Sequence, residues 1–211
     1  MDKKNTMLLT VIAVATLLVA VVGATFAFFA LGQNSTQTGS SAQVTTKGAA
    51  GSVLASGGGK NLLLNVTSAQ MQKTQQGTYY AVLTGDPVTT AQNHELAKFE
   101  VTEAGDKTYT CTFNFTVSST GLEAVKAGEG AITLTAGDGV TLTGGTTFNY
   151  ADIATAKTIS GTVVLNSTRT SADIKVDATL VNTDQEQQTY LAGLNGTVTT
   201  SDIKDFTCTV E

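Results

Sequence analysis

The segment KTYTCTFNFTVSS, residues 107–119, decides the fold class of this chain. Apolar residues occupy every second position, and threonines with one asparagine occupy the positions between them. The apolar set is Tyr109, Cys111, Phe113, Phe115 and Val117. Successive side chains of a strand point to opposite faces of its sheet, so this period of two predicts a strand with an apolar inner face and a hydroxyl-rich outer face. The segment therefore favours an antiparallel sheet with one face buried and the other exposed to solvent.

Nine further segments have the same short, β-branched character, and turn sequences that contain Gly, Asp or Pro separate them. They are residues 62–68, 79–84, 96–102, 131–135, 139–143, 157–166, 171–182, 195–200 and 205–210. Short strands at this spacing are typical of a sandwich or barrel. Two stretches, 120–128 and 183–193, are compatible with one or two helical turns in a connection. We expect residues 61–211 to form one antiparallel β-sandwich domain.

The composition agrees with a β-rich domain and excludes several classes of protein. Of 211 residues, 41% are hydrophobic, which is enough for one sizeable core. There are 39 threonines, 21 glycines and a single proline, and only 14% of residues are charged. Threonine favours pleated, half-exposed surfaces. The formal net charge of −5 argues against a nucleic-acid binder, and the lack of a strict glycine repeat argues against collagen.

Residues 1–31 have the character of a leader, because two lysines precede an uncharged apolar run over 7–31. Two interpretations are open. The layout favours a secretory signal peptide that is cleaved after Ala27, or after Ala24, where small residues occupy the required positions. The run is also long enough to span a bilayer as an uncleaved helical anchor. Both interpretations place the rest of the chain outside the cytoplasm.

The stretch LLTVIAVATLLVAVVGATFAFF, residues 8–29, resembles the leaders of the TasA and camelysin group of secreted bacterial proteins. The rest of the chain resembles this group only in being a threonine-rich β domain. It departs from the group in the neutral stretch 31–43, where an acidic start of the mature chain is expected. The resemblance implies processing by a dedicated signal peptidase, a jelly-roll sandwich, and a role as subunit of an extracellular biofilm-matrix fibre.

Residues 32–60 consist mainly of Gly, Ser, Thr, Gln and Ala, and we expect them to form a flexible arm. Val44, Val53 and Leu54 are its main apolar residues, so the arm is a candidate for adding a strand to the sheet of a partner. The single proline and the few charges leave sheet edges poorly protected against such pairing. The leading hypothesis is therefore a secreted structural subunit that forms a homo-oligomer or homopolymer.

Cys111 and Cys208 lie in matching sequence frames, each on the apolar face of its predicted strand. In an exported domain, two inward cysteines on separate strands predict a disulfide that ties the C-terminal strand to the middle of the fold. Two free buried thiols are the alternative.

No set of catalytic residues is evident. A camelysin-type metalloprotease needs a cluster of zinc ligands, but the chain has one histidine, His94, and Asp138 is better explained as a turn residue. We therefore expect neither enzymatic activity, nor a metal or cofactor, nor a nucleic-acid or small-molecule ligand. Two other functions remain open: a monomeric surface binding module or adhesin tethered by an uncleaved N-terminal helix, and a type IV pilin-like subunit.

Overall fold

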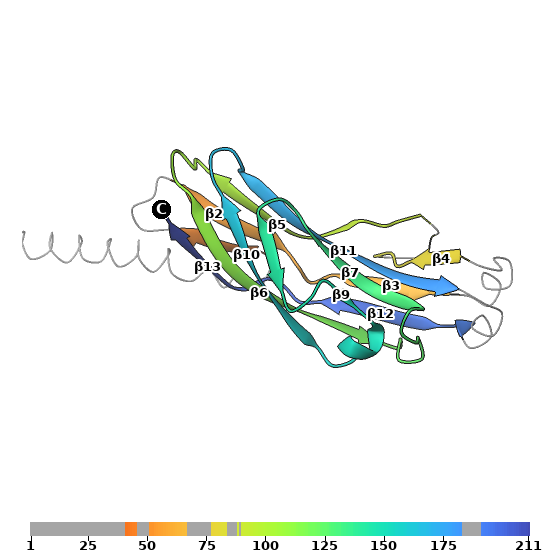
Figure 1. Cartoon of the computed structure of the whole chain (residues 1–211). Coiled ribbons are helices and arrows are strands. Elements are labelled where there is room, and N and C mark those ends of the chain that lie inside the picture. The colour runs from red at the N-terminus through yellow and green to blue at the C-terminus, as the bar shows by residue number, and fades with distance from the viewer. Residues whose placement is uncertain (1–40, 46–50, 67–76, 84–87, 89, 183–190) are drawn as a thin grey trace, which may run out of the picture. The chain divides into compact units, whose positions relative to one another are not determined.

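Two antiparallel β-sheets pack face to face (Figure 1), which confirms the predicted all-β sandwich. The computed structural model describes residues 41–45, 51–66, 77–83, 88, 90–182 and 191–211. The predicted leader helix and the cleavage positions Ala24 and Ala27 lie outside these residues. Within the described part of the chain, no helix is long and apolar enough to cross a membrane.

The first sheet has seven strands, with β11 at its centre. On one side of β11 lies β7, followed by the short β9; on the other side β5 and β4 lie end to end, and β5 is followed by β2 and β1. The strands are β1 (Ser41–Thr45), β2 (Ser52–Gly57), β4 (Gly77–Tyr80), β5 (His94–Thr102), β7 (Gly130–Ala136), β9 (Thr147–Phe148) and β11 (Ser171–Asn182).

The second sheet has six strands and repeats this plan around β6. On one side of β6 lies β10, followed by β8; on the other side β12 and β13 lie end to end, and β12 is followed by β3. The strands are β3 (Asn61–Asn65), β6 (Tyr109–Thr120), β8 (Val140–Thr143), β10 (Lys157–Leu165), β12 (Asn195–Thr200) and β13 (Lys204–Val210). From β5 to β12, each strand lies in the opposite sheet from the one before it.

The alternation predicted from residues 107–119 is observed in β6. Tyr109, Cys111, Phe113, Phe115 and Val117 are all buried between the sheets, and the threonines between them face outward. Phe99 of the first sheet contacts two rings of the second, with centroid distances of 4.7 Å to Phe113 and 5.9 Å to Phe206. A shared aromatic core therefore joins the two sheets.

The predicted flexible arm over 32–60 is wrong for its C-terminal part, and the domain does not begin at residue 61. Val53 and Ala55 are fully buried, and β2 pairs with β5 along its whole length. The low hydrophobicity of this segment wrongly suggested a flexible arm. Two buried side chains and continuous backbone pairing with β5 offset the entropy that is lost when the segment is ordered. Leu54 lies between them in β2 and is half-buried.

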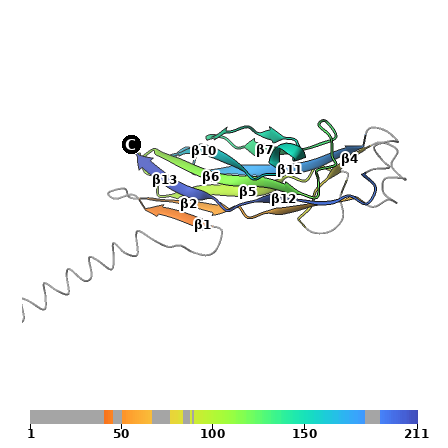
Figure 2. The ribbon, with the colours of Figure 1, turned by 90° about the horizontal axis from the view of Figure 1, so that it is seen from below.

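The strand β1 forms the outer edge of the first sheet and pairs with β2. The view from below shows β1 beside β13, which belongs to the second sheet (Figure 2). Val44 is opposite Val53 in this pairing. The segment that was expected to add to the sheet of a partner thus adds to the sheet of its own chain.

Turns and short helical segments form the described connections between strands. Among the described residues up to 182, the only helix is the 3-10 helix η1 (Tyr150–Ile153), which the sequence did not predict. The helix-compatible stretch 120–128 forms turns, in which the Val125 N–H donates to Leu122 O at 3.1 Å. Most of the other helix-compatible stretch lies outside the described residues.

Candidate functional site

The predicted disulfide between Cys111 and Cys208 is present, with an Sγ–Sγ distance of 2.04 Å. The two residues are directly opposite each other on the neighbouring strands β6 and β13. Cys111 is buried and Cys208 is half-buried. The alternative of two free thiols is therefore wrong, and the C-terminal strand is covalently fixed to the central strand of the second sheet.

A β-bulge interrupts the pairing of β13 with β6 shortly before this disulfide. The register shifts between Lys204 and Thr207, so β13 has one extra residue there. Asp205 takes up the bulge with a φ of 50°, in the left-handed region that few non-glycine residues adopt. Phe206 consequently points into the core, and the exposed Asp205 carboxylate accepts a hydrogen bond of 2.5 Å from Asn114 Nδ2.

The outer face of the second sheet carries a regular array of hydroxyl groups. Strand pairing places one threonine from each of four neighbouring strands in a single row across the sheet. The row consists of Thr141 of β8, Thr162 of β10, Thr112 of β6 and Thr207 of β13. All four are exposed. A second row, parallel to the first, runs from Thr143 through Ser160 to Asn114. We call these two rows, together with Asp205, the hydroxyl face.

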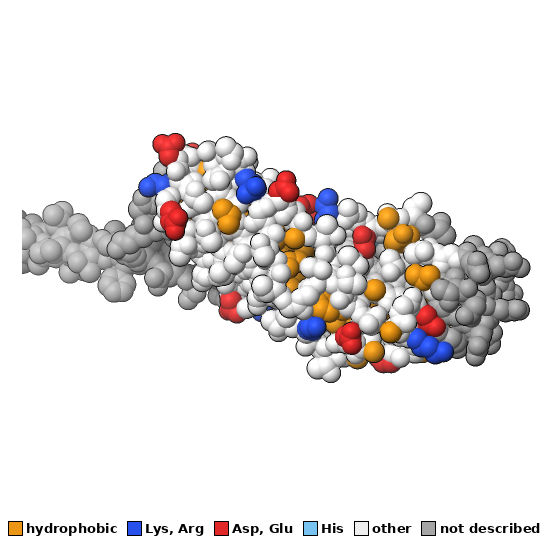
Figure 3. Space-filling model, in the orientation of Figure 1, with side chains coloured by type: hydrophobic (Ala, Val, Ile, Leu, Met, Phe, Trp, Pro, Cys, Tyr) orange, Lys and Arg blue, Asp and Glu red, His pale blue; other side chains and the backbone are white. Residues whose placement is uncertain are grey.

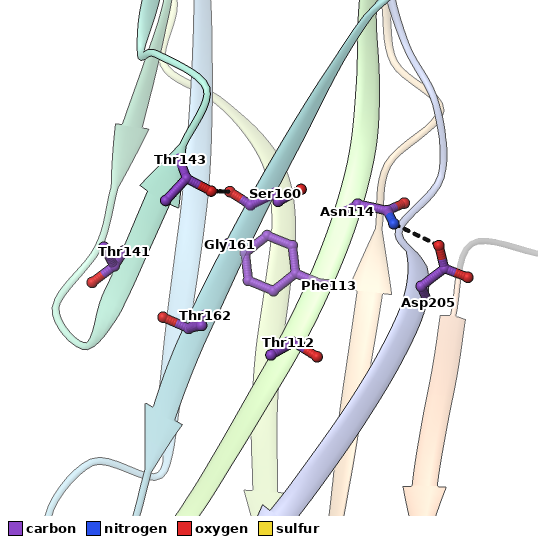
Figure 4. A pocket seen from close by; sticks show the side chains of 9 residues that line it. All are labelled: Thr112, Phe113, Asn114, Thr141, Thr143, Ser160, Gly161, Thr162 and Asp205. Atoms are coloured by element: carbon purple, nitrogen blue, oxygen red, sulfur yellow. Dashed lines mark hydrogen bonds between the residues drawn. The ribbon is translucent and has the colours of Figure 1, made fainter.

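A hollow of about 310 Å³ lies on the hydroxyl face (Figure 4). Its walls come from β8, β10 and β6, and Asp205 of β13 lies at one end, paired with Asn114. The floor includes Gly161, which is opposite Phe113 in the strand pairing. At the opposite end from Asp205, the Thr143 hydroxyl donates to Ser160 O at 3.1 Å.

The outer face of the first sheet is chemically different, because charged side chains lie on its inner strands β5 and β11. Lys98 Nζ lies 2.7 Å from Glu100 Oε1, and Lys175 Nζ lies 3.6 Å from Asp173 Oδ2. The hydrogen bond and charge of Glu100 raise the pKa of Lys98. A second hollow of about 330 Å³ lies among such residues, including Glu95 and Lys98. These ion pairs are partly exposed to solvent and contribute little to stability.

Asp177 lies on this charged face of β11, between the part of β11 that pairs with β5 and the part that pairs with β4. Its Oδ1 atom is buried and has no hydrogen-bond partner among the described residues. Burial raises the pKa of this carboxyl group, and the nearby charge of His94 opposes the rise. The ionised carboxylate is therefore held at a cost in free energy.

No family model matches this chain, and no curated protein or solved structure matches it. The chemistry of its own faces and edges therefore carries the functional interpretation.

The other residues considered from the sequence are not brought together as a site. His94 Nε2 lies 3.0 Å from the carbonyl oxygen of Ala81, to which the ring N–H donates. Asp138 lies in the turn between β7 and β8, as expected for a turn residue. Among the described residues, no group of three His, Cys, Asp or Glu side chains is placed to hold a metal ion.

The sequence did not reveal the hydroxyl face as one surface. Alternation over residues 107–119 predicted that Thr112 faces outward, and Thr162 lies in a segment that was predicted only as a strand. What it did not show was the strand order and register that place them side by side. The bulge at Asp205 also left no recognisable sequence signal, because Lys204, Asp205 and Phe206 read as the ordinary start of a strand.

Proposed function

We propose that this protein is a secreted, non-enzymatic structural subunit of an extracellular matrix or surface fibre, and that copies assemble by exchange of the N-terminal strand β1. The observation that carries the proposal is the position of β1. It is the edge strand of the first sheet, it is five residues long, and among the described residues its only strand partner is β2.

Strand exchange keeps the same contacts and makes them between two chains instead of within one. The donor is β1, which includes Val44, and the acceptor is β2 of the next copy, which includes Val53 and Leu54. This assigns Val53 and Leu54 to the receiving sheet, in place of the donor role expected from the sequence. The other terminal strand, β13, is not free to exchange, because the disulfide holds it on β6.

Three further observations support the proposal. The disulfide agrees with an oxidising location outside the cytoplasm. The regular crossing of consecutive strands between the two sheets supports a jelly-roll topology. The leader resembles that of the TasA and camelysin fibre proteins, which implies a signal peptidase as processing partner and contact with the membrane before cleavage. A cleaved leader leaves β1 near the new N-terminus.

Chemical cross-linking between two distinguishable chains tests the exchange. Gln43 and Leu54 are directly opposite each other in the pairing of β1 with β2. We mix a full-length Gln43→Cys chain with a full-length Leu54→Cys chain of different mass and oxidise the mixture under conditions that give assemblies. Exchange predicts a disulfide-linked heterodimer, which mass spectrometry identifies.

The matched control uses a pair inside the sheet. Leu54 is also opposite Glu100 of β5, a pairing that exchange of β1 leaves within one chain. Mixed Leu54→Cys and Glu100→Cys chains should therefore give no heterodimer. The proposal is contradicted if assemblies form without the first cross-link, or if deletion of residues 28–45 leaves assembly unchanged.

A further inference from the structure

The hydroxyl face offers hydrogen-bonding groups that no described protein atom uses. Thr141, Ser160 and Thr162 are exposed and line the hollow. Within the described part of the chain, their hydroxyl groups make no hydrogen bond to protein. Each hydroxyl can both donate and accept, and its direction adjusts by rotation. The face therefore presents a set of adaptable partners for a ligand that is itself rich in hydroxyl groups.

Asp205 and Asn114 add a fixed pair of polar groups at one end of the hollow. The amide N–H of Asn114 binds one carboxylate oxygen, Oδ2, which orients the carboxylate and leaves Oδ1 available as an acceptor. The backbone of Asp205 is held in a left-handed conformation by the bulge. A charged acceptor makes stronger hydrogen bonds than a neutral one, so this pair would orient a ligand hydroxyl that donates to it.

The electrical character of the hydroxyl face limits the class of ligand. Asp205 is the only charged residue among those that line the hollow. By comparison, the charged hollow on the other sheet is lined by Lys98 and three carboxylates, which belong to Glu95, Asp138 and Asp173. Most of the surface visible in Figure 3 is likewise uncharged, with charged side chains scattered over it. A polyanion would be repelled by Asp205, whereas a neutral polyol can donate to it.

The length of the rows favours a polymer over a single sugar. Neighbouring strands lie about 4.8 Å apart, so a row across four strands extends over roughly 14 Å. The hydroxyl groups repeat along the row at this regular spacing. We propose that the hydroxyl face binds a neutral polysaccharide, which lies across β8, β10, β6 and β13 and donates a hydroxyl hydrogen bond to Asp205. The ligand class goes beyond the proposed structural role, and strand exchange does not depend on it.

Affinity electrophoresis of the full chain in mild detergent tests this proposal. The gels contain hydroxyethylcellulose, soluble starch or dextran as neutral probes, and polygalacturonate as the acidic probe. We expect retardation by at least one neutral polysaccharide and none by polygalacturonate. Binding of the corresponding oligosaccharide, measured by calorimetry, then gives dissociation constants for the variants.

Two variants change the hydroxyl face with little effect on the fold. Thr162→Val keeps the shape of the side chain and removes its hydroxyl, and loss of one hydrogen bond should weaken binding about threefold to tenfold. Asp205→Asn removes the charge but retains the left-handed backbone, which asparagine tolerates, and should weaken binding by at least as much. The matched control is Thr133→Val, on an exposed position of β7 in the other sheet, which should bind like the unchanged protein.

Three results would overturn the proposal. The first is the absence of retardation by all three neutral polysaccharides. The second is equal affinity of Thr162→Val, Asp205→Asn and the unchanged protein. The third is preferential retardation by polygalacturonate, which would place binding on a basic surface instead. None of these results bears on the cross-link between β1 and β2, since the variants leave both strands intact.

Discussion

Gly161 is an inward position of β10 that has no side chain, and the ring of Phe113 occupies the space. The two residues are opposite each other in the pairing of β10 with β6. A Cβ atom on Gly161 would lie 2.8 Å from Cε2 of Phe113, which is closer than packed atoms approach. The glycine thus permits the aromatic contact between the sheets. Its sequence neighbours gave no sign of this role, which depends on a partner 48 residues away in the chain.

Asp177 provides a prediction about the pH dependence of stability. Its pKa is raised in the folded protein by burial, so the native state binds the proton more tightly than the unfolded state. Stability then falls as pH rises from the unfolded-state pKa through the raised native value, and the full cost is present above that value. Asp177→Asn cannot ionise and should therefore have a higher Tm than the unchanged protein at pH 7. The difference should disappear below about pH 3.

Asp173→Asn is the control for this prediction, since Asp173 lies on the same strand and face. Its carboxylate pairs with Lys175 at 3.6 Å, so its loss should lower stability slightly or leave it unchanged. Thermal melts of both variants from pH 3 to pH 8 distinguish the two behaviours. A gain in Tm that is equal for both variants would point to the total charge of the face and away from the buried Oδ1 of Asp177.

Among the elements, β13 depends most on a covalent bond. The disulfide closes a loop with a sequence separation of 97 residues, and the chain-entropy model gives roughly 4 to 5 kcal/mol for a loop of this length. We expect a Cys111→Ala, Cys208→Ala double variant to lose stability of this order in urea unfolding. Hydrogen exchange should accelerate first in Lys204–Val210, because β13 has a strand partner on one side only among the described residues.

Strand β2 should respond differently to loss of the disulfide. It is held by β5 and by the burial of Val53 and Ala55, none of which involves the cysteines. In the variant without the disulfide, hydrogen exchange in β2 should therefore accelerate only as much as global unfolding does. Early exchange in β2 that matches β13 would show that the disulfide stabilises the whole domain evenly, against the expectation of local release.

The sequence predicted most strands and missed those with weak apolar patterns. The central strands β6 and β11 were predicted within two residues, because their alternation runs over twelve residues and tertiary contacts reinforce it. Strands β1, β2 and β9 were missed. Their segments are short and rich in Ser, Thr, Ala and Gly, so pairing with a neighbouring strand, and not side-chain pattern, decides their structure.

At the scale of the whole molecule, the true start of the domain can be tested by truncation. A chain that begins at residue 51 retains β2, whereas one that begins at residue 61 loses it. Removing the buried Val53 and Ala55 should cost at least about 2 kcal/mol in addition to the backbone pairing with β5. Urea unfolding should therefore show a clearly lower midpoint for 61–211 than for 51–211. Equal midpoints would restore the boundary that the composition suggested.

The candidate site was predictable only in its parts. Alternation over residues 107–119 predicted the outward position of Thr112, and the matching sequence frames of Cys111 and Cys208 predicted the disulfide, since both depend on local pattern. The row of four threonines and the pairing of Asn114 with Asp205 depend on how β8, β10, β6 and β13 align, and they come from segments up to 95 residues apart. Long-range register is set by turns, bulges and core packing together, which a single sequence does not specify.

The position of the disulfide also determines how the domain should respond to a pulling force. In the fibre proposed above, tension would pass through both ends of the folded part of each subunit. At the C-terminal side, peeling of β13 is stopped by the covalent bond between Cys208 and Cys111. At the N-terminal side, β1 is held by its pairing with β2, and none of the described cysteines lies in either strand. Under tension the joint between subunits should therefore part before the body of the domain unfolds, and the parted copies would remain folded and able to rejoin.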